Sequence, residues 1–116
     1  MMKKLVLIAL VITCQSSFAM DASAYLEANT PARKQVLEMY IAGVGQGFFW
    51  ANIEAKNATK VALFCPPTTM TLNSQNYVAL LDQQIALYKD TNRVKDTLPV
   101  ELVLLRALQD NFPCKS

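Results

Sequence analysis

Few side chains in this sequence could carry out chemistry. The chain contains three cysteines and nine carboxylates, and it has no histidine. Ser-His and Cys-His nucleophile pairs are therefore impossible, and the commonest metal ligand is missing. The carboxylates are scattered along polar stretches and show no pair of the kind that acid–base hydrolases use. We therefore predict that the protein is not an enzyme and that it needs no metal and no cofactor.

All three glycines fall in one stretch, Gly43-Val44-Gly45-Gln46-Gly47. Alternating glycines are similar to a phosphate-binding loop, but nucleotide-binding glycine motifs follow a strand and open a helix. Here the glycines lie inside a predicted helix, so a nucleotide site is not predicted. Gly43 and Gly47 are four residues apart, and we expect them to let the backbone of another helix come close.

The first 19 residues predict a secretory signal peptide. Lys3 and Lys4 precede an apolar run over 5–13, and Ser17 and Ala19 place small residues where a signal peptidase recognises them. We predict cleavage after Ala19 and a periplasmic mature chain.

Removal of that peptide leaves residues 20–116, which is enough for one domain and too few for two. It also removes Lys3 and Lys4, so the mature chain carries nine basic and nine acidic residues. This balance provides no basic surface for nucleic acid, and no later stretch approaches the roughly 20 apolar residues of a membrane span. An alternative is a lipid anchor on Cys14, although Thr13 fits poorly as the residue that precedes the cysteine in a lipid-attachment site.

The two cysteines of the mature chain predict a disulfide. Cys65 and Cys114 are the only pair left after removal of the signal peptide, and an exported protein enters an oxidising compartment. The bond would close a loop of about 50 residues, which the chain-entropy model values at about 4 kcal/mol. The alternative is two unrelated buried thiols.

One long helix dominates the predicted fold, over about 31–57. Thr30 is suited to its N-cap and Pro31 to its first helical position. Its apolar residues form two faces: Val36, Leu37, Tyr40, Ile41, Val44 and Phe48 on one, and Met39, Ala42, Phe49, Trp50 and Ile53 on the other. We expect such a helix to be sandwiched by other helices or to leave one face for a partner.

Two shorter helices are predicted after it. One begins at Thr71 or Asn73 and ends near Lys89, and another opens at Pro99. Their apolar residues at helical spacing are Tyr77, Leu81, Ile85 and Tyr88 in the first helix, and Val100, Val103, Leu104, Ala107 and Leu108 in the second. Between them the charged segment 90–97 is predicted to be an exposed loop.

The remaining segments fix the fold class. Residues 20–29 are predicted to begin as a loose arm, and the alternative is a short helical turn around Ala24–Ala28. The short apolar run 61–64 is the only stretch that could be a strand, and the prolines that follow it argue against a sheet. We predict an all-α fold, a small bundle of three to five helices around the central helix 31–57, held by one disulfide.

Three motifs give the sequence a family resemblance. They are Tyr40-x-x-Gly43-x-x-x-Gly47, Phe64-Cys65-Pro66 and Ala107-Leu108-x-x-x-Phe112-Pro113-Cys114. With these motifs the chain resembles the Rap/Tai family of periplasmic immunity proteins of bacterial type VI secretion, over roughly residues 36–114. The resemblance implies a helical fold related to the acid-stress chaperone HdeA. It also implies a protein that covers the active site of a secreted cell-wall-degrading effector, typically a peptidoglycan amidase.

Two surfaces are candidates for the contact with such a partner. The first is the predicted loop, through Asp90, Arg93, Lys95 and Asp96, because a charged loop on a rigid scaffold is a common recognition device. The second is an apolar patch of Phe49, Trp50 and Ile53, for a homodimer or the effector; the alternative is that the N-terminal arm or the third helix covers it. Other functions left open are an HdeA-like acid-stress chaperone and a general envelope factor without a dedicated effector.

Overall fold

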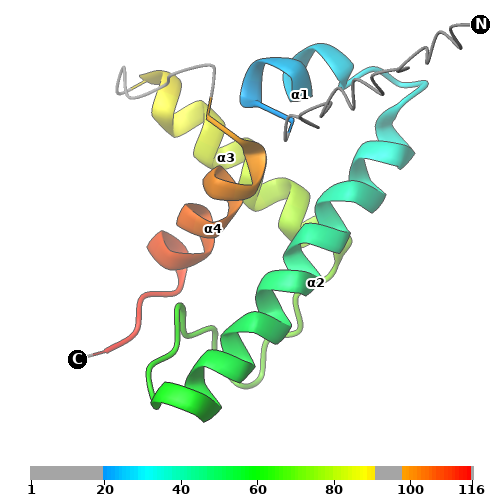
Figure 1. Cartoon of the computed structure of the whole chain (residues 1–116). Helices are drawn as coiled ribbons and strands as arrows, with labels where there is room; N and C mark the ends of the chain where they lie inside the picture. The colour runs from blue at the N-terminus through cyan, green and yellow to red at the C-terminus, as the bar shows by residue number, and fades with distance from the viewer. Residues whose placement is uncertain (1–19, 91–97, 116) are drawn as a thin grey trace, which may run out of the picture.

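The computed structural model describes residues 20–90 and 98–115, and the described chain is all-α. It contains α1 (Ala22–Ala28), α2 (Lys34–Thr59), α3 (Ser74–Asp90) and α4 (Val100–Asn111). Figure 1 shows α2 along one side of the molecule, with α3 and α4 against it and α1 across the end from which α2 starts. The prediction of a small all-α bundle around one long helix is confirmed.

The central helix begins and ends later than predicted. Residues 31–33 form a turn, in which the Arg33 N–H donates to the Thr30 carbonyl, and the helix begins only at Lys34. Thr30 is therefore not the N-cap, because that position falls to Arg33, whose side chain makes no capping bond. At the other end Lys60 adopts a left-handed conformation with φ of 64° and donates its N–H to the Lys56 carbonyl. This turn reverses the chain into residues 61–73, which we call the strap.

A single apolar core joins the four helices. Its buried members are Ala22, Tyr25, Leu37, Ile41, Phe64, Tyr77, Leu81, Ile85, Tyr88, Val100, Val103, Leu104 and Leu108. All nine of the apolar positions predicted for the two shorter helices are buried. The core receives Phe64 from the strap as well, so the strap is packed and not merely a connection.

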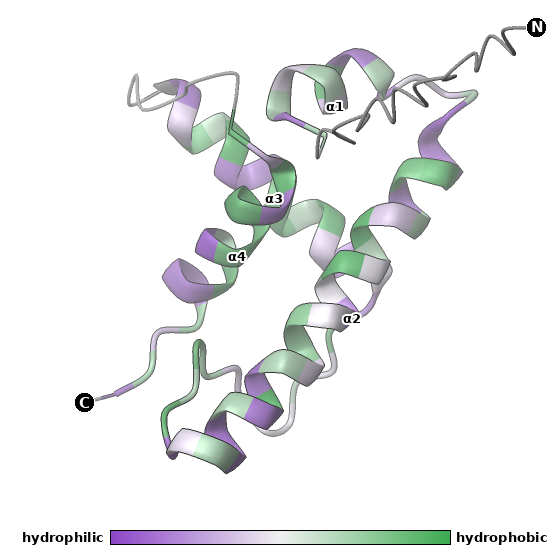
Figure 2. Cartoon of the chain, in the orientation of Figure 1, coloured by the Kyte–Doolittle hydropathy of each residue, from purple (hydrophilic) through white to green (hydrophobic). Residues whose placement is uncertain are grey.

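Only one face of α2 is buried. Leu37, Ile41 and Gly45 are its buried residues, whereas apolar residues recur along the whole helix (Figure 2). Val36 was predicted to share one apolar face with Leu37 and Ile41 but is 68% exposed, because it lies 100° around the helix from Leu37. Met39 and Trp50, from the second predicted face, are 69% and 61% exposed. Of the two arrangements predicted for this helix, the described residues adopt the one with a free face.

The arm before α2 is more ordered than its sequence predicts. Asp21 caps α1 by accepting the Ala24 N–H at 2.7 Å, and the Tyr25 side chain is buried. Just before this helix, residues 20–22 pair with 98–100 through two backbone hydrogen bonds. We call this pairing the N-terminal bridge. It fixes the start of α4 to the start of α1.

The predicted disulfide is confirmed. Cys65 in the strap is bonded to Cys114 after α4, with 4.9 Å between the Cα atoms. The Cys65 N–H also donates to the Phe112 carbonyl at 2.7 Å. The strap, and with it the far end of α2, is thereby attached to the C-terminal segment. No helix in the described part of the chain is long and apolar enough to cross a membrane.

Candidate protein-binding surfaces

The charged segment predicted as a contact surface lies largely outside the described residues. Asp90 is the last residue of α3, whereas Arg93, Lys95 and Asp96 belong to the gap between 90 and 98. The structure does describe the scaffold on either side of that gap. At Leu98 the chain is held by the N-terminal bridge, where the Ala22 N–H donates to the Leu98 carbonyl at 2.9 Å.

Two tyrosine–carboxylate pairs reinforce the same end of the bundle. The Tyr25 hydroxyl of α1 donates to Asp82 Oδ1 of α3 at 2.8 Å, and the Tyr40 hydroxyl of α2 donates to Glu101 Oε1 of α4. Between α3 and α4, the buried Gln84 donates from Nε2 to Asp110 Oδ2 at 2.9 Å. Each helix therefore has a polar side chain that fixes it against a neighbour.

These contacts disfavour ionisation of both tyrosines. The pKa of Tyr40 rises from 10.0 to about 12, because its hydroxyl donates to the Glu101 carboxylate and because it is partly desolvated. The pKa of Tyr25 is raised by burial and then by its hydrogen bond to Asp82. Both tyrosines must therefore stay protonated for these two hydrogen bonds to form.

A loss of stability in alkali follows from these pairs. A raised folded-state pKa means that the contribution of Tyr40 is complete below pH 10 and is lost as the pH rises through about 12. We expect the melting temperature of the wild type to fall over that interval, and that of Tyr40→Phe, which has no hydroxyl to ionise, to fall less. At neutral pH the same variant should lose about 0.5–1.5 kcal/mol with its hydrogen bond. Equal alkaline losses in the two proteins, measured by thermal unfolding from pH 8 to pH 12, would contradict this assignment.

The exposed side of α2 is a second candidate surface, which we call the outer face. It consists of Val36, Met39, Gly43, Gly47 and Trp50, which lie within about 80° of one another around the helix. A Cβ atom added at Gly43 or Gly47 would meet no atom within 4 Å. The prediction that these glycines admit another helix of the chain is therefore wrong; they leave a flat strip of exposed backbone instead.

The close approach occurs at Gly45, which the sequence did not single out. A Cβ atom there would lie 2.5 Å from the Tyr77 ring of α3. Gly45 is thus the glycine that lets α2 and α3 pack. The only sequence signal for this contact was Tyr77, a bulky aromatic residue among the regularly spaced apolar residues of the next helix.

The three residues of the predicted apolar patch lie on two different surfaces. Trp50 belongs to the outer face, whereas Phe49 and Ile53 line a groove between α2 and the strap. The Phe49 and Trp50 rings still touch edge to face, with centroids 5.4 Å apart. They mark the ridge between the two surfaces, and no single flat patch contains all three residues.

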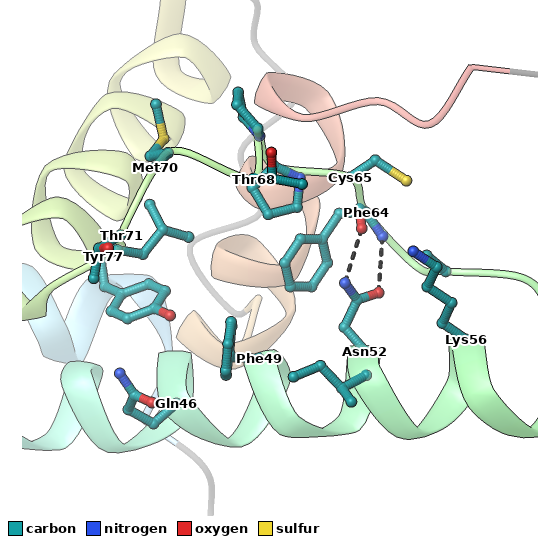
Figure 3. Close-up of a pocket in the computed structure, with 15 residues that line it drawn as sticks. Gln46, Phe49, Asn52, Lys56, Phe64, Cys65, Thr68, Met70, Thr71 and Tyr77 are labelled. Atoms are coloured by element: carbon teal, nitrogen blue, oxygen red, sulfur yellow. Dashed lines mark hydrogen bonds between the residues drawn. The ribbon is translucent and has the colours of Figure 1, made fainter.

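The groove beneath the strap has a volume of about 560 Å³. Figure 3 shows Phe49 pointing from α2 toward the strap, between Tyr77 and Phe64. The strap contributes mostly apolar or small residues: Ala62, Cys65, Pro66, Pro67, Thr68, Met70, Thr71 and Leu72. The polar side chains Gln46, Asn52 and Lys56 of α2 complete the lining. Its shape depends on how the strap is held over α2.

Asn52 holds the strap, a role that the sequence did not reveal because this residue falls on the polar strip of the helix. Its Oδ1 accepts the Leu63 and Phe64 N–H groups at 2.6 and 3.1 Å, and its Nδ2 donates to the Phe64 carbonyl at 2.8 Å. Figure 3 shows the two bonds to Phe64. The amide is thus bonded on both sides to the backbone of the residue that enters the core. An amide about two turns before the end of a largely apolar helix was the only signal.

Removal of this amide should loosen the strap. We expect Asn52→Ala to lower the free energy of unfolding by about 1–3 kcal/mol, because backbone groups near the core lose their partners. Asn57→Ala, on the exposed end of the same helix, is the matched control and should change stability by less than about 0.5 kcal/mol. Urea denaturation measures both. A similar small effect in the two variants would show that water replaces the Asn52 amide without loss.

Within residues 20–90 and 98–115, no group of three or more His, Cys, Asp and Glu side chains is arranged to hold a metal ion. The described surfaces are instead an exposed apolar helix face, a groove lined by both apolar and polar side chains, and a scaffold on both sides of a charged segment. Together with the fold, they define a small, disulfide-bonded helical protein with surface available for contact with another macromolecule.

The comparison with known families agrees with this class of protein and assigns the chain to one family. The family model of the Rap1a immunity proteins matches residues 7–114, and the chain belongs to this family. The resemblance to the Rap/Tai immunity proteins is therefore confirmed, and with it the general function of an immunity protein. No curated protein and no solved structure matches the chain.

Proposed function

We propose that the mature chain, residues 20–116, is a periplasmic immunity protein of type VI secretion that binds and inhibits a cell-wall-degrading effector, a peptidoglycan amidase. Membership of the Rap1a immunity family, over residues 7–114, is the observation that carries the proposal. The predicted signal peptide supports the compartment, since a cell-wall hydrolase acts outside the cytoplasmic membrane.

The charged segment after α3 is the proposed inhibitory contact, through Arg93, Lys95 and Asp96. Its support is the scaffold beside it: the N-terminal bridge and the Tyr40–Glu101 pair fix the chain where this segment ends. A segment attached to fixed positions loses less conformational entropy on binding than one attached to mobile chain. Charged residues there would also suit a polar active-site cleft.

The first experiment identifies the partner. The oxidised mature chain is used to capture proteins from envelope and culture fractions under conditions in which type VI secretion is active. Recovery of one peptidoglycan hydrolase that is inhibited at a one-to-one ratio would support the proposal. Capture of many unrelated proteins after acid treatment alone would favour an HdeA-like chaperone, and no capture would favour a general envelope factor.

The second experiment tests the contact. We expect Arg93→Ala with Asp96→Ala to weaken inhibition of the captured hydrolase by about tenfold or more, because two charged contacts are lost. Glu54→Ala with Lys115→Ala, which also removes one acidic and one basic exposed residue, should leave inhibition unchanged. Full inhibition by the first variant would remove the segment from the interface while leaving the immunity role intact.

For the outer face of α2 we propose self-association into a homodimer. The observation that favours this is the exposure of Met39 and Trp50 beside two bare glycines, because such a surface suits close packing against a second helix. Sedimentation equilibrium of the mature chain tests the proposal. A monomer at high micromolar concentration would contradict it.

A further inference from the structure

One buried polar atom in the described structure lacks a partner. Glu101 lies in the first turn of α4, and its Oε1 accepts the Tyr40 hydroxyl. Its other carboxylate oxygen, Oε2, is buried and has no hydrogen-bond partner. A buried carboxylate oxygen without a donor is costly, so a donor placed beside it would stabilise the fold.

The N-terminal bridge brings the backbone of Met20 to the same turn. The Val100 N–H donates to the Met20 carbonyl at 2.9 Å, and Asp21 is opposite Pro99 in an antiparallel bridge. In an antiparallel pair the N–H and C=O groups of one residue face the same side. The backbone of Met20 therefore lies beside the first turn of α4, which carries Glu101.

Cleavage after Ala19 would change the chemistry of this nitrogen. In the uncleaved chain it is a neutral amide with a single N–H. After cleavage it is an ammonium group with three donors and a positive charge, like the end of a lysine side chain. A hydrogen bond between two charged groups is about twice as strong as a neutral one.

We propose that the new α-ammonium group of Met20 pairs with Glu101 Oε2, so that removal of the signal peptide completes the contact between the N-terminal arm and α4. The proposal rests on the cleavage site given under the proposed function. Glu101 then joins three segments, because one oxygen binds Tyr40 of α2 and the other binds the mature N-terminus. The processed chain is more stable at this corner than its precursor.

The pairing is tested first through the ionisation of the amine. In the mature chain the pKa of the Met20 amine should lie about one unit above its ordinary range of roughly 7.7–8.0, and in Glu101→Gln it should return to that range. Asp21 also lies beside the amine, so Asp21→Asn is the matched control; it keeps an N-cap for α1 and should change the pKa little. NMR titration of Met20 labelled at its Cα gives the pKa of the amine in the wild type and in each of the two variants.

Stability measured at pH 7, where the amine is protonated, provides a second readout that needs no titration. Acetylation of the Met20 amine removes its charge, and it should raise the unfolding equilibrium constant on the order of tenfold in the wild type and less than about twofold in Glu101→Gln. An ordinary amine pKa in the wild type, or an equal acetylation effect in the two proteins, would overturn the proposal. If Glu101→Gln does not fold, the wild-type pKa and acetylation effect still decide it.

The N-terminus of the exported protein is determined by mass. A terminus at Met20 is expected, and any other terminus would overturn both the cleavage site and the pairing. None of these measurements uses an effector. Failure of the pairing would therefore leave the immunity function standing, and failure of the immunity function would leave the pairing standing.

Discussion

Reduction of the Cys65–Cys114 disulfide is expected to lower the free energy of unfolding by about 4 kcal/mol. The two cysteines are 49 residues apart, so the bond removes much of the freedom of the unfolded chain between them. In a domain of this size, such a change corresponds to a fall in melting temperature of roughly 15–30 °C. Both cysteines are exposed, so a small thiol reductant reaches the bond in the folded protein.

Three variants separate the crosslink from other effects. Cys65→Ser, Cys114→Ser and the double variant should all melt where the reduced wild type melts, and reductant should not shift the double variant. A fall of only a few degrees would mean that Asn52 and the Cys65–Phe112 backbone bond already hold the strap without the crosslink. Calorimetry with and without reductant distinguishes these outcomes.

Gly45→Ala should cost about 2–3 kcal/mol, although alanine favours helix. The new methyl group would lie 2.5 Å from the ring of Tyr77, whose side chain is buried in the core. Either α2 and α3 must separate or the ring must leave its rotamer, and overpacking of this kind typically costs 1–3 kcal/mol. Loss of this contact affects two helices of the core at once.

Gly43→Ala and Gly47→Ala are the matched controls, each two residues away on the same helix. Their methyl groups meet no atom, so each should stabilise the monomeric fold by up to about 1 kcal/mol through helix propensity. Urea denaturation with unchanged m-values gives the comparison. If all three variants are stabilised, the Tyr77 ring moves easily, and the α2–α3 contact is looser than the structure indicates.

The sequence was sufficient for the elements that repeat a pattern. The apolar spacing of α3 and α4 predicted every core position named for them, because a one-sided helix has only one way to bury its apolar face. The disulfide followed from the compartment and the number of cysteines. For α1 the sequence predicted only a short helical turn around 24–28, because seven residues carry too little periodicity, although Asp21 three residues before Ala24 was a usable capping signal.

The sequence did not predict which residues of α2 are buried, because that depends on how α2 is rotated about its axis against the other helices. The apolar residues of α2 surround most of the helix, so they did not determine that Leu37 faces inward and Val36 outward. The same rotation decides that Gly45 meets Tyr77 while Gly43 faces away. Asn52 and Glu101 were missed for a related reason, since a polar residue acquires a partner only once the distant segment is placed beside it.

The position of the disulfide also sets an order of events in time. If the chain is exported N-terminus first, Cys65 enters the oxidising compartment 49 residues ahead of the cysteine it must meet. During that interval the Cys65 thiol is unpaired, and it can form a disulfide with the unpaired Cys65 of another emerging chain. Rapid secretion therefore favours a covalent dimer through Cys65 as a by-product, and a thiol–disulfide isomerase becomes a factor in the yield of correctly bonded protein.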